Sequence, residues 1–180
     1  VSPWQWWADC EPTPREVFQL EADFERLEVP SVAYRGIFIN DEDWGLNPWS
    51  SNNYEPKMRQ RNGEDSTPRN GEIGPYTHER IFELLLRLRA NIFWPAMHEC
   101  TVPFYLIKGN KEVADKYGIL ISTSHCEPMM RNTNGEWRKA GLGDYNFVTN
   151  AKQVVHFWEE RVKELSGSDC LYTLGMRGVH

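Results

Sequence analysis

Clusters of chemically active side chains follow four short apolar segments of the sequence. The clusters are Asn40-Asp41-Glu42-Asp43-Trp44, His98-Glu99, His125-Cys126-Glu127 and Arg177. Carboxyl groups about 6.5–9.5 Å apart can hydrolyse a glycosidic bond with inversion, one protonating the leaving oxygen and the other activating water. One carboxylate of the first cluster and Glu99 could form such a pair. The same acidic cluster also fits an ordinary solvated turn.

Two other kinds of chemistry are open to these residues. A metal-dependent hydrolase could use His98, Glu99 and His125 as ligands, with Asp41 as a further one, although no HxH or HExxH spacing occurs. Arg177 could grip a carboxylate through its planar guanidinium group or form a structural salt bridge. The eight Trp residues have flat faces that can stack on sugar rings or fill a core. A non-catalytic glycan-binding module is therefore a third interpretation.

The apolar segments predict strands, and helical patterns lie between them. The predicted strands lie near residues 32–40, 91–97, 119–124 and 171–176. Apolar residues at helical spacing predict helices over Thr77–Arg89, Asn110–Tyr117 and Asn150–Leu165, with Asn150 as an N-cap, and Glu16–Leu27 is a further candidate. The stretch 47–75 is polar and rich in Gly, Pro and Asn, so it predicts a long loop.

Alternating strands and helices predict an α/β fold with parallel β/α units. No GxGxxG or GxxxxGK[ST] pattern follows the first strand, which removes the usual nucleotide-binding signals. Active groups at the C-terminal ends of successive strands are typical of a (β/α)₈ TIM barrel. Four units are half of such a barrel. We therefore expect residues 31–180 to form a truncated first half, with residues 1–30 as an entry segment.

Alternation along a strand decides which side chains share a face of the sheet. Glu99 has the parity of Phe93, and His125 and Glu127 have the parity of Ile121. Charged side chains are poorly placed beneath the helices that cover a parallel sheet. We therefore expect the faces that carry Phe93 and Ile121 to look into the barrel mouth.

The composition fits a folded domain and excludes some partners. The chain has 180 residues, 40% of them hydrophobic, and a net charge of -6, which argues against a nucleic acid as partner. No apolar run approaches the ~20 residues that span a bilayer, so no membrane partner is expected. The four cysteines have no zinc-like spacing and predict buried free thiols: Cys10, Cys100, Cys126 and Cys170.

Several segments, taken together and in order, resemble glycoside hydrolase family 115, the xylan α-glucuronidases. They are Ser2–Asp9 (SPWQWWAD), Tyr34–Gly45 (YRGIFINDEDWG), Leu86–Asn91 (LRLRAN), Trp94–Met97 (WPAM), Thr123–Met129 (TSHCEPM) and Gly175–Gly178 (GMRG). The similarity covers nearly the whole chain. Residues 50–72 depart from it, because the loop there is longer than the resemblance leads us to expect.

The resemblance implies an enzyme that removes glucuronic acid, or its 4-O-methyl ether, from α-1,2 linkages on xylan with inversion. It also implies that no cofactor is needed and that glucuronoxylan or its oligosaccharides are bound. The parent enzyme is expected to be a homodimer and to be secreted or periplasmic, although this chain has no visible signal peptide. By resemblance, Glu99 is the catalytic acid, and Asp43 or Asp41 assists the water. The substrate-contacting positions implied in this way are Asn40, Trp44, His125, Glu127 and Arg177.

Overall fold

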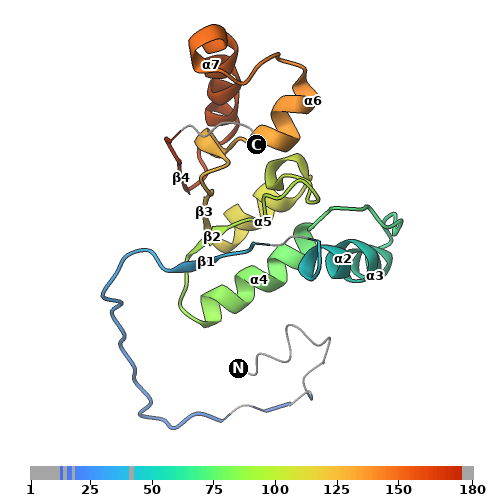
Figure 1. Cartoon of the computed structure of the whole chain (residues 1–180). Coiled ribbons are helices and arrows are strands. Elements are labelled where there is room, and N and C mark those ends of the chain that lie inside the picture. Colours follow the sequence, from blue (N-terminus) through green and yellow to red (C-terminus); the bar gives the residue numbers. More distant parts are fainter. Residues whose placement is uncertain (1–12, 14–15, 18, 41–42, 176–180) are drawn as a thin grey trace.

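Four short strands form one parallel sheet. The computed structural model describes residues 13, 16, 17, 19–40 and 43–175. The strands are β1 (Gly36–Phe38), β2 (Ile92–Trp94), β3 (Leu120–Ser122) and β4 (Cys170–Leu171). They lie side by side in chain order, and every neighbouring pair is parallel (Figure 1). The predicted α/β class and strand order are confirmed, with strands shorter than predicted.

Helices occupy every connection between the strands. The first connection holds α2 (Leu46–Trp49), the π-helical η1 (Ser50–Tyr54), α3 (Glu55–Arg61) and α4 (Pro75–Arg87). The second holds η2 (Phe104–Leu106) and α5 (Asn110–Tyr117). The third holds η3 (Pro128–Met130), the π-helical η4 (Thr133–Trp137), α6 (Arg138–Ala140) and α7 (Phe147–Glu164). Within the described part of the chain, none of these helices is long and apolar enough to cross a bilayer.

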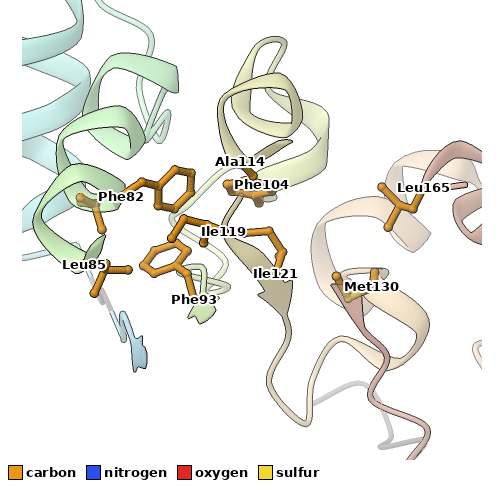
Figure 2. Packing of buried hydrophobic residues seen from close by; sticks show 10 residues of the cluster. Phe82, Leu85, Phe93, Phe104, Ala114, Ile119, Ile121, Met130 and Leu165 are labelled. Atoms are coloured by element: carbon orange, nitrogen blue, oxygen red, sulfur yellow. The ribbon is translucent and has the colours of Figure 1, made fainter. Parts of the chain in front are cut away.

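The main core lies between one face of the sheet and the helices α4 and α5. Phe82 and Leu85 of α4, Ala114 of α5, Phe93 of β2 and Ile121 of β3 are all buried in this cluster (Figure 2). The rings of Phe82 and Phe93 meet edge to face, with their centroids 5.4 Å apart. This packing fixes which face of each strand the helices cover.

The opposite face of the sheet carries partly exposed apolar side chains. Phe38 and Trp94 meet there edge to face at 5.9 Å and are 40% and 38% exposed. The expectation that the faces carrying Phe93 and Ile121 look into a barrel mouth is therefore wrong. Strand β2 already ends at Trp94, so strand alternation does not extend through the following loop to Glu99.

The predicted loop over 47–75 is wrong in its first part, because residues 46–61 are helical. These helices bury hydrogen-bonded polar groups. The hydroxyl oxygens of Ser50 and Thr77 lie 2.8 Å apart, and Oε1 of Glu55 accepts the backbone N–H of Thr77 at 2.6 Å. A segment stabilised in this way shows no apolar stripe, so its polar composition resembled that of a loop.

The candidate helix over Glu16–Leu27 is not present in the residues of that segment that the structure describes. They follow an extended path away from the sheet (Figure 1). Leu20 and Leu27 are 78% and 88% exposed. A short helix needs an apolar face packed on a core, and nothing in the described chain covers these side chains.

The other three predicted helices are confirmed as α4, α5 and α7. Helix α7 begins earlier than predicted, because its N-cap is Asn146. Oδ1 of Asn146 accepts the N–H groups of Val148 at 2.9 Å and Thr149 at 3.4 Å. The predicted N-cap, Asn150, lies inside α7 with non-helical backbone angles and donates from Nδ2 to the carbonyl of Leu142 at 2.8 Å.

The cysteines differ from the prediction in their burial. Cys100, Cys126 and Cys170 form no disulfide among the described residues and are only half-buried, while Cys10 lies outside the described residues. For these three cysteines the prediction of thiols outside a disulfide is thus confirmed among the described residues, and the prediction of buried ones is wrong.

Candidate active site

The polar clusters meet at the C-terminal edge of the sheet. Because the strands are parallel, the chain leaves each of them at the same edge. The described candidates there are Asn40, Asp43 and Trp44 after β1, Glu99 after β2, and His125 and Glu127 after β3. Asp41 and Arg177 lie outside the described residues. The structure therefore brings three of the four predicted clusters to one edge.

After β1, the backbone at Asp43 adopts an unusual conformation. Its φ of 72° lies in the left-handed region, which is rare for residues other than glycine and recurs at functional sites. Asp43 and its neighbour Trp44 are exposed, Trp44 by 82%. A carboxylate and a flat aromatic face are thus both open to a ligand at this point.

After β2, Glu99 forms an ion pair with Arg138 of α6, with Oε1 and Nη2 3.2 Å apart. The two side chains are 56% and 57% exposed. The pair joins the loop after β2 to the start of α6.

A cavity of about 520 Å³ lies beside this ion pair. Its polar lining comes from two loops and from the helices η4 and α6, and consists of Asn70, Glu99, Thr101, Asn134, Arg138 and Lys139. The N–H of Val102 donates to the carbonyl of Gly71 at 2.8 Å, which joins the two loops. The volume falls within the range of small-molecule sites, and carboxylate, guanidinium and amide groups are suited to sugar hydroxyls.

After β3, a turn exposes His125 and buries Glu127. The N–H of Glu127 donates to the carbonyl of Ser124 at 3.0 Å. The Glu127 side chain is 5% exposed, and its Oε1 accepts Nδ2 of Asn132 at 3.1 Å. Burial raises the pKa of Glu127 to about 8, against the opposing effect of the Asn132 hydrogen bond, and nearby Glu136 raises the pKa further. Glu127 therefore keeps its proton at neutral pH.

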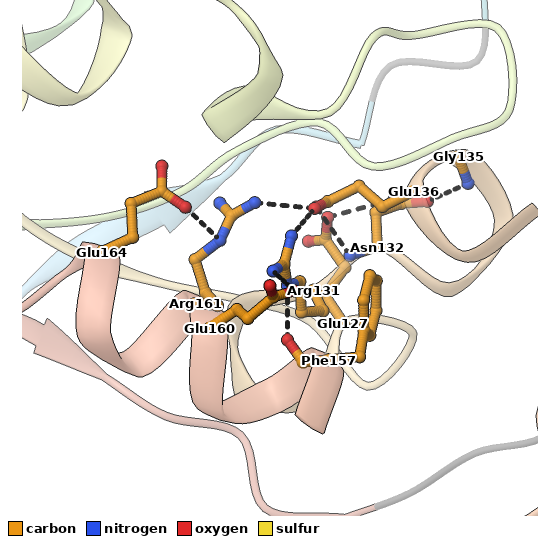
Figure 3. Close-up of polar contacts among 9 residues, drawn as sticks. All are labelled: Glu127, Arg131, Asn132, Gly135, Glu136, Phe157, Glu160, Arg161 and Glu164. Atoms are coloured by element: carbon orange, nitrogen blue, oxygen red, sulfur yellow. Dashed lines mark hydrogen bonds and ion pairs between the residues drawn. The ribbon is translucent and has the colours of Figure 1, made fainter. Parts of the chain in front are cut away.

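A buried ionic network surrounds Glu127 (Figure 3). Oε2 of Glu136 contacts Nη1 of Arg131 at 2.7 Å and Nη2 of Arg161 at 2.6 Å. The guanidinium of Arg161 also lies 4.6 Å from the ring centroid of Tyr105. Both arginines are thus paired with Glu136, and among the described residues no ion pair joins either of them to Glu127.

The sequence interpretation missed Asn132 and Glu136, although a local signal was present. Oδ1 of Asn132 accepts the N–H of Gly135 at 2.6 Å, and the N–H of Asn132 donates to Oε1 of Glu136 at 3.1 Å. This reciprocal pattern is that of a capping box, shifted by one residue. An Asn followed four residues later by Glu could have indicated the start of η4.

Some predicted partners share no hydrogen bond or ion pair in the described part of the chain. Within the described chain, no hydrogen bond or ion pair joins Glu99 to Asp43, His125 or Glu127. Nor do the described residues contain a group of three or more His, Cys, Asp or Glu side chains that could hold a metal ion. The set His98, Glu99 and His125 is therefore not assembled as the metal-dependent alternative requires.

Comparison with known proteins identifies the family. The model of glycosyl hydrolase family 115 matches residues 28–180, and no curated protein matches the chain. The solved structure of a family GH115 4-O-methyl-α-glucuronidase, BtGH115A, with specificity for decorated arabinogalactans, is 60% identical with a TM-score of 0.85. The match covers 100% of this chain and 22% of BtGH115A, so the chain spans about a fifth of that protein's length. The chain belongs to glycosyl hydrolase family 115.

Proposed function

We propose that the protein containing this chain is an α-glucuronidase, which removes glucuronic acid or its 4-O-methyl ether from a glycan. The observation that carries the proposal is the 60% identity over the whole chain to a family GH115 4-O-methyl-α-glucuronidase. In this proposal residues 31–180 supply the first four β/α units of a (β/α)₈ barrel, and residues 1–30 lead into it. The substrate then binds at the C-terminal edge of the sheet.

The proposed substrate is glucuronoxylan or its oligosaccharides, cleaved at α-1,2 linkages with inversion. A second candidate substrate is a glucuronidated arabinogalactan, since BtGH115A has specificity for decorated arabinogalactans. The polar cavity beside Glu99 suits either glycan, because its lining groups bind hydroxyls rather than one particular sugar.

In the proposed mechanism Glu99 protonates the leaving oxygen, and Asp43 or Asp41 activates the water. When substrate binds, Glu99 exchanges its contact with Arg138 for one with the leaving oxygen. An exposed ion pair of this kind is worth at most ~1 kcal/mol, so the exchange has a small energetic cost. Arg177 then binds the glucuronate carboxylate, and the remaining contacts come from Asn40, Trp44 and His125.

The reaction is proposed to need no cofactor and to take place in a secreted or periplasmic homodimer. Retention of activity after treatment with a chelator and dialysis would agree with catalysis by carboxyl groups alone. Loss of activity that added zinc or another divalent ion restores would instead favour a metal-dependent barrel hydrolase. Sedimentation analysis of the intact protein tests the dimer separately.

The deciding experiment is to incubate the intact protein with glucuronoxylan and with glucuronidated arabinogalactan and to measure released glucuronic acid. NMR at early times reports the anomer, and inversion at an α-linkage should release the β-anomer first. Binding to both glycans without release would favour the glycan-binding module. Early release of the α-anomer would refute inversion while preserving the proposed hydrolase.

A further inference from the structure

We propose that Glu127 is a positioning residue, which fixes the Ser124–Glu127 turn through Asn132 and so holds His125 at the C-terminal edge of the sheet. This departs from the role of direct substrate contact that the family resemblance implies for Glu127. The inference rests on the proposed function, since His125 is taken to contact the substrate. In this inference Glu127 and Asn132 keep the contact of His125 with the substrate in place.

Glu127 is anchored through both its backbone and its side chain. Its N–H donates to the carbonyl of Ser124 at 3.0 Å, and its own carbonyl accepts the hydroxyl of Thr123 at 2.7 Å. Its Oε1 accepts Nδ2 of Asn132 at 3.1 Å. His125 lies between these anchors and is itself exposed. The position of the imidazole ring therefore depends on contacts that its neighbours make.

Asn132 extends this anchor to the preceding strand connection. Its Nδ2 also donates to the carbonyl of Met97 at 3.0 Å, in the loop after β2. Its Oδ1 accepts the N–H of Gly135 at 2.6 Å. The amide of Asn132 thus uses donor and acceptor groups at once, and it joins the loop after β2 to the turn that carries His125.

A neutral side chain at position 127 is sufficient for this role. The side chain is enclosed, and Arg131 and Arg161 are already paired with Glu136. Gln has the shape of Glu and keeps an oxygen that accepts from Asn132. The alternative role would act through Oε2, which is buried without a hydrogen-bond partner in the structure. Gln replaces one carboxyl oxygen with an amide and cannot transfer a proton, so it separates the two roles.

The test uses Glu127→Gln, Glu127→Ala and Asn132→Ala in the intact protein, with kcat and KM measured on a glucuronoxylan oligosaccharide. We expect Glu127→Gln to retain kcat/KM within about threefold, since the positioning contacts persist. Glu127→Ala and Asn132→Ala should lower kcat/KM by on the order of 10- to 100-fold, mainly through KM, as misplacement of a substrate contact does. A loss in Glu127→Gln as large as in Glu127→Ala would overturn the inference and favour direct carboxyl chemistry.

A double-mutant cycle with His125→Ala separates positioning from general destabilisation. If Asn132 acts through His125, Asn132→Ala should add little further loss in the His125→Ala background. Additive losses would contradict the inference. Asn110→Ala is the matched control, because buried Asn110 likewise donates from Nδ2 to two carbonyls, those of Ile73 at 3.2 Å and Phe104 at 3.1 Å. It should lower thermal stability and leave kcat/KM close to that of the wild type.

Amide hydrogen exchange tests the anchor even if the proposed function fails. Wild-type protein that releases no glucuronic acid from any tested glycan would refute the function alone. Exchange at the N–H of Glu127 should be faster in Asn132→Ala than in wild type and unchanged in Glu127→Gln. Equal protection in Asn132→Ala and wild type would overturn the positioning role, whatever the substrate.

Discussion

Glu99 and Arg138 form an ion pair between two different connections of the sheet, with Oε1 and Nη2 3.2 Å apart. Glu99 follows β2, whereas Arg138 begins α6 in the connection after β3. Both side chains are more than half exposed, so the pair adds little to stability. The pair instead determines where the two side chains lie, because it holds a carboxylate and a guanidinium together at the edge of a polar cavity.

The first prediction concerns Glu99 as the proposed acid. Glu99→Gln keeps the shape but removes the transferable proton, so kcat on glucuronoxylan should fall by about 10²–10⁴-fold. An aryl glucuronide with a good leaving group needs less acid help and should lose far less. Steady-state kinetics on both substrates checks this. Equal losses would mean that Glu99 is not the acid.

A second prediction concerns the carboxylate that assists the water. Asp43→Asn should slow glucuronoxylan and aryl glucuronide alike, because both reactions need attack by water. Asp41→Asn, measured in parallel, decides which of the two carries the role, since only one should show the uniform loss. If neither variant loses activity, the activating group lies elsewhere in the barrel.

The third prediction concerns recognition of the charged sugar. If Arg177 binds the glucuronate carboxylate, Arg177→Lys should weaken kcat/KM by on the order of tenfold or more, because lysine lacks the planar fork. The matched substitution Arg87→Lys, on the exposed face of α4, controls for a general effect of the change. Full activity of Arg177→Lys would remove Arg177 from the site.

The sequence predicted well those elements whose apolar side chains lie in the core. Phe93 and Ile121 mark β2 and β3 because strands beneath helices need large apolar groups, and Leu85 belongs to the apolar stripe of α4. The helices over residues 46–61 were wrongly predicted as a loop, because buried polar groups such as Ser50 stabilise them. Composition alone cannot separate a polar helix from a loop.

The site was predictable only as a list of residues at strand ends. The contact between Asn132 and the carbonyl of Met97 joins positions 35 apart in the chain, and no local pattern encodes it. The pKa of Glu127, which burial raises, is likewise affected by charges on other elements, because Glu136 raises it and Arg161 lowers it. The sequence therefore predicted Glu127 at the C-terminal edge of the sheet, but not its burial.

A fourth prediction concerns the start of α7. Asn146→Ala removes the acceptor for the N–H groups of Val148 and Thr149 and should lower the free energy of unfolding by about 1 kcal/mol. Asn146→Asp keeps an acceptor and should lose much less. Urea denaturation of the intact protein measures both. A larger effect of Asn150→Ala than of Asn146→Ala would restore Asn150 as the cap.

The last prediction concerns the pH dependence of stability that arises from Glu127. In the native state burial raises the pKa of Glu127 to about 8, whereas its ordinary value is 4.5. Between these values the native state keeps a proton that the unfolded chain has lost, so the unfolding free energy falls as pH rises. The stabilisation is complete below the lower value and is lost as pH rises through the higher one.

Glu127→Gln has no proton to lose and should remove this dependence. Relative to wild type, the variant should gain stability steadily between about pH 5 and pH 8 and hold a constant advantage above that range. Thermal unfolding of both proteins across the range measures the difference, and Glu83→Gln, on the exposed side of α4 where it pairs with Arg87, controls for the loss of one acidic side chain. Parallel curves for wild type and Glu127→Gln would show that Glu127 is already ionised in the native protein. Arg161 would then have to be shared between Glu136 and Glu127, and the neutral hydrogen bond to Asn132 would give way to a charged one.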